Sequence, residues 1–289
     1  MAGDAAFEEI NEAKANLNHI YDQADPRAYF RELQKLDYGI PDVAKPIFQK
    51  LISHLQRRGD DTIRILDLGC SYGVNAALLK HDLSMEDLYE HWGKAKLADA
   101  ASEDVIAHDE SFFAEFDDAD GIEMIGLDQA QNAISFAEKV GLLDEGLAED
   151  LETGPLSARG KEELAPVDLV TSTGCVGYVT EKSFARLLPT LTQGRPPWIA
   201  NFVLRLFPYD VIEATLKDWG YVTEKFEGQT FVQRRFASAD EQEQVLEQLR
   251  DQGIDPTGKE ADGHLVAEFY LSRSAKDVAN LPVARLLTA

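Results

Sequence analysis

The feature that most constrains the fold is a short apolar run that ends in a glycine turn. Residues 63–69 read Ile-Arg-Ile-Leu-Asp-Leu-Gly, and such a nearly continuous apolar stretch is typical of a strand buried on both faces. The following residues, 71–83, are rich in helix formers. The sequence therefore predicts a strand, a glycine turn and a helix, which is the repeating step of an α/β fold.

The same alternation continues along the chain. Strand-like residues lie at 122–128, 167–174 and 198–207, with a short third strand around 147–155, and helical patterns separate them. Two later segments, 225–236 and 264–272, also have β-type composition. We predict a doubly wound, mainly parallel, seven-stranded Rossmann-like sheet that ends in an antiparallel strand pair.

Two helical regions lie outside this alternation. Residues 1–60 carry apolar side chains at helical spacing in three segments, 7–21, 25–36 and 41–58. Residues 80–122 interrupt the strand-helix pattern and read as an inserted helical segment. We therefore divide the chain into amino-terminal helices over 1–60 and an α/β domain over 61–289 that contains the insertion.

Composition excludes several classes of function. The chain of 289 residues has 52 Asp and Glu against 28 Lys and Arg, a net charge of −24, so nucleic acids and membrane surfaces are unfavourable partners. The two cysteines and six scattered histidines have no metal-ligand spacing, and we predict no metal. No apolar run approaches the roughly 18 residues needed to span a bilayer, and the first residues do not resemble a secretory signal, which favours a cytoplasmic protein. The oligomeric state stays open, a homodimer included.

The glycine turn argues against phosphate-rich cofactors. The dinucleotide fingerprint would need glycine where the chain has Ser71 and Val74, and no Gly-Lys pair is followed by Ser or Thr. Asp67, just before the turn, would repel phosphate but suits a ligand with an amino group or another positive centre. An NAD(P)-dependent oxidoreductase shares the predicted fold and is the alternative hypothesis, although Ser71 and Val74 do not match its fingerprint.

The sequence Asp-Leu-Gly-Cys-Ser-Tyr-Gly over 67–73 resembles the turn of class I S-adenosylmethionine-dependent methyltransferases, whose pattern is Asp/Glu-x-Gly-x-Gly-x-Gly. The resemblance covers 63–80 closely and 120–272 by element order and a few side chains. It implies S-adenosyl-L-methionine as cofactor and methyl transfer to an O, N or S atom of a small molecule. Ser71 replaces the middle glycine, which we expect to be tolerated only with ordinary backbone dihedrals.

The turn also looks like that of plant carboxyl methyltransferases of the salicylate and jasmonate type, which hints at a carboxylate acceptor. A non-catalytic protein that binds S-adenosylmethionine is a further alternative. No catalytic base is identified from the sequence.

The resemblance implies where the cofactor binds. Asp128 is expected to accept hydrogen bonds from both ribose hydroxyls, and Asp150 to contact the adenine amino group. Ser172 and Thr173 would pass under the cofactor. The predicted cofactor-binding set is Asp67, Gly69, Cys70, Ser71, Gly73, Asn75, Asp128, Gln129, Asp150, Leu151, Ser172 and Thr173.

Fewer residues are candidates for substrate binding. In the family, amino-terminal helices often form a lid, which makes Tyr21, Tyr29 and Tyr38 candidates, with helix packing as the equal alternative. Cys175 and Tyr178 follow the fourth strand. A buried arginine needs a partner, so Arg205 pairs with either an anionic substrate or an internal carboxylate.

Overall fold

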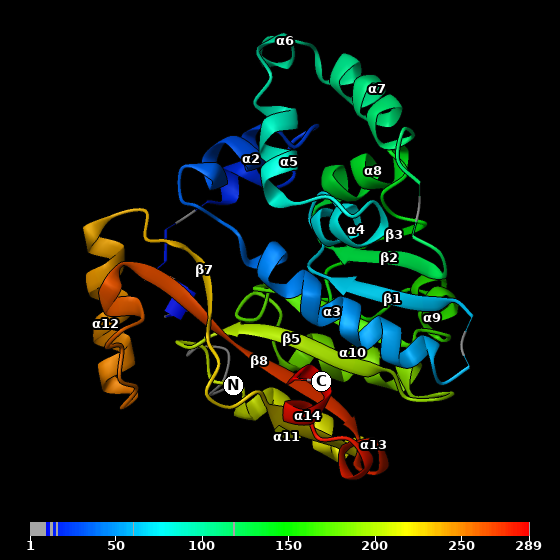
Figure 1. Cartoon of the computed structure of the whole chain (residues 1–289), viewed down its shortest axis with the longest axis vertical. Helices are drawn as coiled ribbons and strands as arrows, with labels where there is room; N and C mark the ends of the chain where they lie inside the picture. Colours follow the sequence, from blue (N-terminus) through cyan, green and yellow to red (C-terminus); the bar gives the residue numbers. More distant parts are fainter. Residues whose placement is uncertain (1–9, 12–13, 16, 60, 118, 289) are drawn as a thin grey trace.

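One mixed sheet forms the centre of the computed structural model, which describes residues 10–11, 14–15, 17–59, 61–117 and 119–288 (Figure 1). In these residues the sheet has eight strands, in the order β3-β2-β1-β4-β5-β8-β6, and β7 also pairs with β8. The first five strands are parallel and β8 is antiparallel to β5. The strands are β1 (Ile63–Leu68), β2 (Ile122–Asp128), β3 (Glu145–Ala148), β4 (Leu169–Thr173), β5 (Trp198–Leu204), β6 (Tyr221–Lys225), β7 (Phe231–Arg235) and β8 (His264–Ser274).

The predicted mainly parallel sheet with an antiparallel end is confirmed, and two details are wrong. A separate strand, Tyr221–Lys225, precedes the predicted one, because the long β8 pairs with β6 along one half and with β7 along the other. The third strand ends at Ala148 rather than continuing to 155, because the next residues form a turn closed by the Gly154 N–H donating to the Asp150 carbonyl.

Helices cover both faces of the sheet, as a doubly wound fold requires. One face carries the helices that connect the strands on the β1-to-β3 side, and the other carries those that lead to β4, β5 and β6 (Figure 1). β5 is buried along its whole length, which explains its continuous apolar sequence. The first group is α3 (Ile40–Gln56), α4 (Val74–Lys80) and α8 (Gln131–Lys139); the second is α9 (Ala158–Leu164), α10 (Glu181–Leu191) and α11 (Asp210–Asp218).

Four helices come directly before or after β8 in the chain. α12 (Ala239–Asp251) and η2 (Glu260–Asp262) come between β7 and β8, and α13 (Ala275–Asn280) and α14 (Val283–Thr288) follow β8. No helix within the described part of the chain combines the length and apolar character needed to cross a membrane.

The amino-terminal region contains η1 (Asn18–Ile20) and α2 (Arg27–Gln34) ahead of α3. Of the helix predicted over 7–21, residues 7–9, 12–13 and 16 lie outside the described residues, and Asn18–Ile20 form the short η1. Because α3 packs on β1, β4 and β7, it belongs to the cover of the sheet. We therefore use the word lid for residues 17–34 only, and the division at residue 60 remains a prediction.

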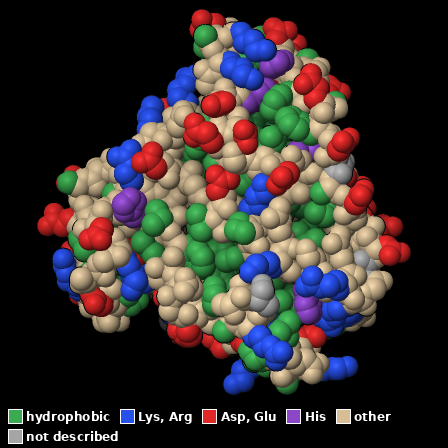
Figure 2. Space-filling view, in the orientation of Figure 1, with side chains coloured by type: hydrophobic (Ala, Val, Ile, Leu, Met, Phe, Trp, Pro, Cys, Tyr) green, Lys and Arg blue, Asp and Glu red, His purple; other side chains and the backbone are tan. Residues whose placement is uncertain are grey.

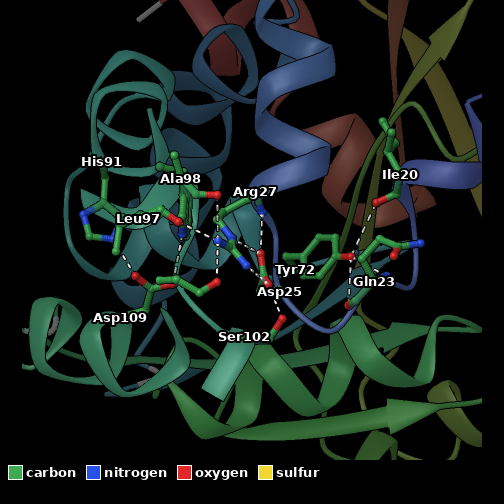
Figure 3. A network of polar contacts seen from close by, with 12 residues as sticks. Ile20, Gln23, Asp25, Arg27, Tyr72, His91, Leu97, Ala98, Ser102 and Asp109 are labelled. Carbon is green, nitrogen blue, oxygen red and sulfur yellow. Dashed lines mark hydrogen bonds and ion pairs between the residues drawn. The ribbon is translucent and has the colours of Figure 1, made fainter. Parts of the chain in front are cut away.

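The insertion consists of α5 (Met85–Trp92), α6 (Ala95–Ala98) and α7 (Ser102–Phe113), and it is attached to the lid by a polar network (Figure 3). Arg27 donates to both carboxylate oxygens of Asp25, and its Nη1 also donates to the carbonyls of Leu97 at 2.5 Å and Ala100 at 2.9 Å. The Ser102 hydroxyl donates to Asp25 at 2.6 Å. The insertion therefore fixes the start of α2.

A buried carboxylate joins the helices of the insertion. Asp109 is fully buried, and its two oxygens lie 2.6 Å from His91 Nε2 and 2.9 Å from Trp92 Nε1 (Figure 3 shows the His91 contact). His91 also stacks on Phe112. Since both rings belong to α5, Asp109 connects α7 to α5.

Replacing Asp109 with alanine should lower the free energy of unfolding by about 3 kcal/mol, because two buried ring nitrogens lose their acceptor. Urea unfolding measures the loss. Glu110→Ala removes an exposed acid from the same helix and serves as the control. Equal stability of the two variants would contradict the role of Asp109.

Candidate functional site

A cavity of about 450 Å³ lies at the carboxyl ends of β1, β2, β3 and β4, where an open parallel sheet binds its ligands. Its other walls are formed by the lid, by β7 and by the loop that follows β4. Most residues predicted from the sequence line it. They are Gly69, Ser71, Asp128, Gln129, Asp150, Leu151 and Thr173 of the cofactor set, and Tyr21, Tyr29, Tyr38, Cys175 and Tyr178 of the substrate set.

The prediction of Arg205 as a substrate contact is wrong, because its guanidinium is bound by groups of the protein. Its Nη1 donates to Glu260 at 2.6 Å and its Nη2 to the Asp255 carbonyl at 2.9 Å, and it does not line the cavity. Of the two partners considered for this arginine, the internal carboxylate is therefore the one present. Arg205 therefore lies outside the candidate substrate site.

Five residues of the predicted cofactor set lie behind the cavity wall. Cys70 packs beside Gly126, where a Cβ would be only 2.7 Å from the Cys70 Sγ. The Ser172 hydroxyl is buried and donates to Asn201 at 2.8 Å. These side chains support the wall and do not line the cavity; the five are Asp67, Cys70, Gly73, Asn75 and Ser172.

Asp67 is the most unusual of these supports. One oxygen accepts hydrogen bonds from Asn75 Nδ2 at 2.8 Å and from the Thr171 hydroxyl at 3.0 Å, and the other has no partner among the described residues. Burial raises the pKa of this carboxyl to about 7, although the two hydrogen bonds oppose the rise. Asp67 therefore changes charge near neutral pH.

The glycine turn delivers a backbone donor to Asp128. The Ser71 N–H donates to one carboxylate oxygen of Asp128 at 2.9 Å, and the Ala130 N–H donates to the other at 3.0 Å. Burial raises the pKa of Asp128, and these backbone bonds oppose the rise. The Gln129 N–H also stabilises this carboxylate, so of its roughly four lone-pair sites about one stays available to a ligand in the cavity.

Ser71 contradicts the expectation of ordinary dihedrals. Its φ of 50° lies in the left-handed region, between Gly69 at 71° and Gly73 at 78°. The backbone at Ser71 thus has the conformation that glycine adopts easily. For serine this conformation costs about 1 kcal/mol. Its hydroxyl is buried without a hydrogen-bond partner in the described residues.

Asp150 lies where β3 ends, but its carboxylate is occupied. It accepts from the Glu152 N–H at 2.9 Å and from the Thr153 hydroxyl at 2.6 Å, and the latter bond lowers its pKa although burial opposes the effect. Glu152 lines the same wall and is held by Thr180 and Ser183. The end of β3 therefore supplies a rigid acidic rim.

Tyr21 and Tyr29 of the lid line the cavity together with Tyr38 from the segment before α3. The Tyr29 ring lies 5.6 Å from that of Tyr21, 6.4 Å from Tyr38 and 5.7 Å from Tyr72. The Tyr72 hydroxyl accepts from the Gln23 N–H at 2.7 Å (Figure 3). These contacts join the lid to the glycine turn through an apolar cluster.

Three polar residues that complete the walls belong to no motif that would predict them: Lys14, Gln233 and Arg234. Arg234 pairs with Glu241 at 2.6 Å, and Glu241 also accepts from the Ala15 N–H at 2.8 Å, which brings residue 14 to the cavity. Only the pairing of β7 with β8 places this wall beside the loop after β4. The apolar pattern of β7 indicates its strand but not its neighbours.

The ammonium group of Lys14 lies against two aromatic rings. Its Nζ lies 4.5 Å from the centre of the Tyr178 ring and 4.9 Å from that of Phe207. Burial and the nearby Arg234 lower its pKa to about 7, while Glu241 opposes the effect. Within the described residues, no cluster of three or more His, Cys, Asp or Glu side chains could hold a metal ion.

Ser71→Gly should raise the free energy of unfolding by up to about 1 kcal/mol, because glycine adopts the left-handed region without a steric cost. Thermal unfolding measures the gain. Ser71→Ala is the matched control, since it removes the hydroxyl but keeps the Cβ. An equal gain in both variants would assign the effect to the buried hydroxyl.

The raised pKa of Asp67 predicts a pH dependence of stability. In the unfolded chain this group loses its proton near the ordinary 3.8, and in the folded protein only near 7, so its contribution to stability falls between these values as the pH rises. Asp67→Asn should abolish that fall, since an amide does not titrate. Urea unfolding across this range tests it against the exposed Asp218→Asn. Parallel curves for the wild type and Asp67→Asn would contradict it.

Comparison with known proteins gives matches at the level of structure alone. No protein-family model matches the sequence, and no curated protein matches it. The fold is similar to a TehB-like SAM-dependent methyltransferase from Corynebacterium glutamicum (13% identity, TM-score 0.37, 75% of this chain and 83% of that one). It is also similar to a precorrin-6y C5,15-methyltransferase from Geobacter metallireducens (12%, 0.38, 78% and 87%) and to magnesium protoporphyrin IX methyltransferase from Synechocystis (12%, 0.36, 80% and 79%).

These identities and scores are too low for the activities of those enzymes to be carried over. The strand order and the pairing of β8 stand on the structure itself. The chain has the Rossmann-like fold predicted from its resemblance to class I S-adenosylmethionine-dependent methyltransferases.

Proposed function

We propose that the protein transfers a methyl group from S-adenosylmethionine to a small molecule. One observation carries the proposal: a single cavity has the Asp128 carboxylate and the glycine turn on one side, and Lys14, Tyr178 and Arg234 on the other. The first side fits the cofactor that the sequence of the turn implies. We assign the second to the methyl acceptor.

The surroundings of α4 disfavour a dinucleotide. In dinucleotide-binding folds the pyrophosphate contacts the amino end of the helix after the first strand. Here Tyr72 packs between Tyr29 and Phe136, and Val74 and Asn75 are buried, so the start of α4 is not among the residues that line the cavity. The acidic rim would also repel phosphates.

The same wall suits S-adenosylmethionine, which is cationic at sulfur and carries hydroxyl and amino donors. Asp128 would accept a hydrogen bond from the ribose hydroxyls with its remaining acceptor capacity. Asp67 supports this wall from behind and does not itself line the cavity. Asp150 and Glu152 would lie around the adenine end of the cofactor.

The sulfonium of the cofactor supplies an already activated methyl group. The protein therefore has to hold the acceptor atom in line and exclude water. Tyr21, Tyr29 and Tyr38, whose rings contact one another at the cavity, would perform the second task. Lys14 can hold or receive a proton of the acceptor, because its amine exchanges protons near neutral pH.

The size of the cavity supports a small acceptor. About 450 Å³ is within the range of sites for small ligands and has to contain both reactants. The lid lies along it and is held by Tyr72 and, through Asp25, by Ser102 of the insertion, which leaves little room for a folded macromolecule.

Asp128→Asn should weaken the binding of S-adenosylhomocysteine about tenfold or more, because an acceptor for charge-assisted hydrogen bonds is lost. Isothermal titration calorimetry measures the change. Asp218→Asn, on an exposed part of α11, is the matched control. Unchanged affinity in Asp128→Asn would show that Asp128 does not bind the cofactor.

The reaction itself is tested by incubating the wild type with methyl-labelled S-adenosylmethionine and a metabolite extract. A labelled product, identified by its mass, supports the proposal and names the acceptor. Binding of NADH without binding of S-adenosylhomocysteine would replace it with the oxidoreductase. Cofactor binding without any labelled product would indicate a non-catalytic binding protein.

A further inference from the structure

A second cavity, of about 470 Å³, lies at the opposite end of the sheet. Its walls come from the end of α3, the first residue of β5, the end of β8, and α13 and α14. Since β5 begins here, and the carboxyl ends of the strands parallel to it line the first cavity, the two cavities are separated by the length of the sheet. Nothing in the proposed methyl transfer uses the second one.

The side chains of this cavity are mainly cationic. Arg58, Arg273, Lys276 and Arg285 line it, against the single carboxylate of Asp277. Figure 2 shows Lys and Arg side chains gathered around a histidine at the end of the molecule that carries α13 and α14. In a chain with a net charge of −24, this local excess of positive charge is against the general trend.

The one acid of the cavity is already engaged. Asp277 accepts from Arg58 Nη2 at 2.9 Å and from Trp198 Nε1 at 3.0 Å. Lys276 and Arg285 are both exposed, and neither has an ion-pair partner within the described part of the chain. The cavity thus keeps uncompensated positive charge at its mouth.

Arg273 provides a buried donor at the same place. It is fully buried, its guanidinium lies 4.8 Å from the centre of the Trp198 ring, and its Nη2 donates to the Leu281 carbonyl and to Glu224. Its Nε and Nη1 have no hydrogen-bond partner among the described residues. Buried guanidinium donors without acceptors are costly unless a ligand satisfies them.

We propose that this second cavity binds a small phosphate-bearing anion. Guanidinium groups present forked donors that match phosphate oxygens, and the ammonium of Lys276 adds a compact charge. The volume admits a phosphate together with a small organic group. The negative charge of the rest of the molecule disfavours a longer polyanion such as a nucleic acid.

His54 offers a spectroscopic reporter. Its ring stacks on Trp198 with centroids 5.4 Å apart, and it lines the cavity. Burial lowers its pKa, and the guanidiniums of Arg57, Arg58 and Arg273 lower it further. A bound anion would offset those charges, so it should raise the pKa of His54.

The test uses the full chain with inorganic phosphate and, in a second arm, glycerol 3-phosphate, each against sodium chloride at equal ionic strength. We expect both phosphates, beyond chloride, to raise the thermal unfolding temperature and the pKa of His54 measured by NMR, with His54→Gln assigning the signal. The double variant Lys276→Ala/Arg285→Ala should need about ten times more phosphate to produce either effect. These exposed positions should not disturb folding.

Lys217→Ala/Arg250→Ala removes the same two charges from exposed sites outside the cavity and should leave binding unchanged. A response to glycerol 3-phosphate alone would assign the site to phosphate esters. No effect beyond chloride, or equal effects in both double variants, would overturn the proposal. Binding of S-adenosylhomocysteine, measured in parallel, reports separately on the first cavity.

Discussion

The buried carboxyl of Asp67 joins three elements on which the first cavity depends. Through one oxygen it holds Asn75 on α4 and Thr171 on β4, while Asp67 itself belongs to β1. Asn75 also donates to Thr173 at the carboxyl end of β4. The distance between two strands and the following helix is thus fixed by side chains, and the turn from Gly69 to Gly73 must span it in a compact left-handed route.

That route determines what the neighbouring residues can do. With Ser71 in the left-handed region, its N–H points to Asp128 at the end of β2, and the next residue, Tyr72, points away to meet the lid. The turn therefore orients one carboxylate and anchors one cover with consecutive residues. Asp22 adds a second anchor, since it accepts from the Asn132 N–H at the start of α8 at 2.6 Å. Rigid support of this kind is what a precise binding site requires.

Much of this arrangement follows from local sequence, because apolar runs define the parallel strands and their carboxyl ends must share one edge. Gly69, Asp128 and Thr173 could be grouped on that basis. Lys14 and Arg234 could not, because Glu241 joins two segments that are distant in the chain. The partner of Arg205 is equally non-local, and the strand at Tyr221–Lys225 exists because β8 is long enough to pair with two strands. Tertiary pairing decided each of these points.

The two cavities also show how one acidic chain can maintain opposite local fields. Acids of the first cavity, Asp22, Asp128, Asp150 and Glu152, lie around a site suited to a cationic ligand. The cations of the second lie at the other end of the sheet, and charges more than about 8 Å apart are largely screened in physiological salt. The overall charge therefore governs encounters with large polyanions, whereas each cavity selects small ligands by its own side chains. Separation along the strands allows both selections in a single domain.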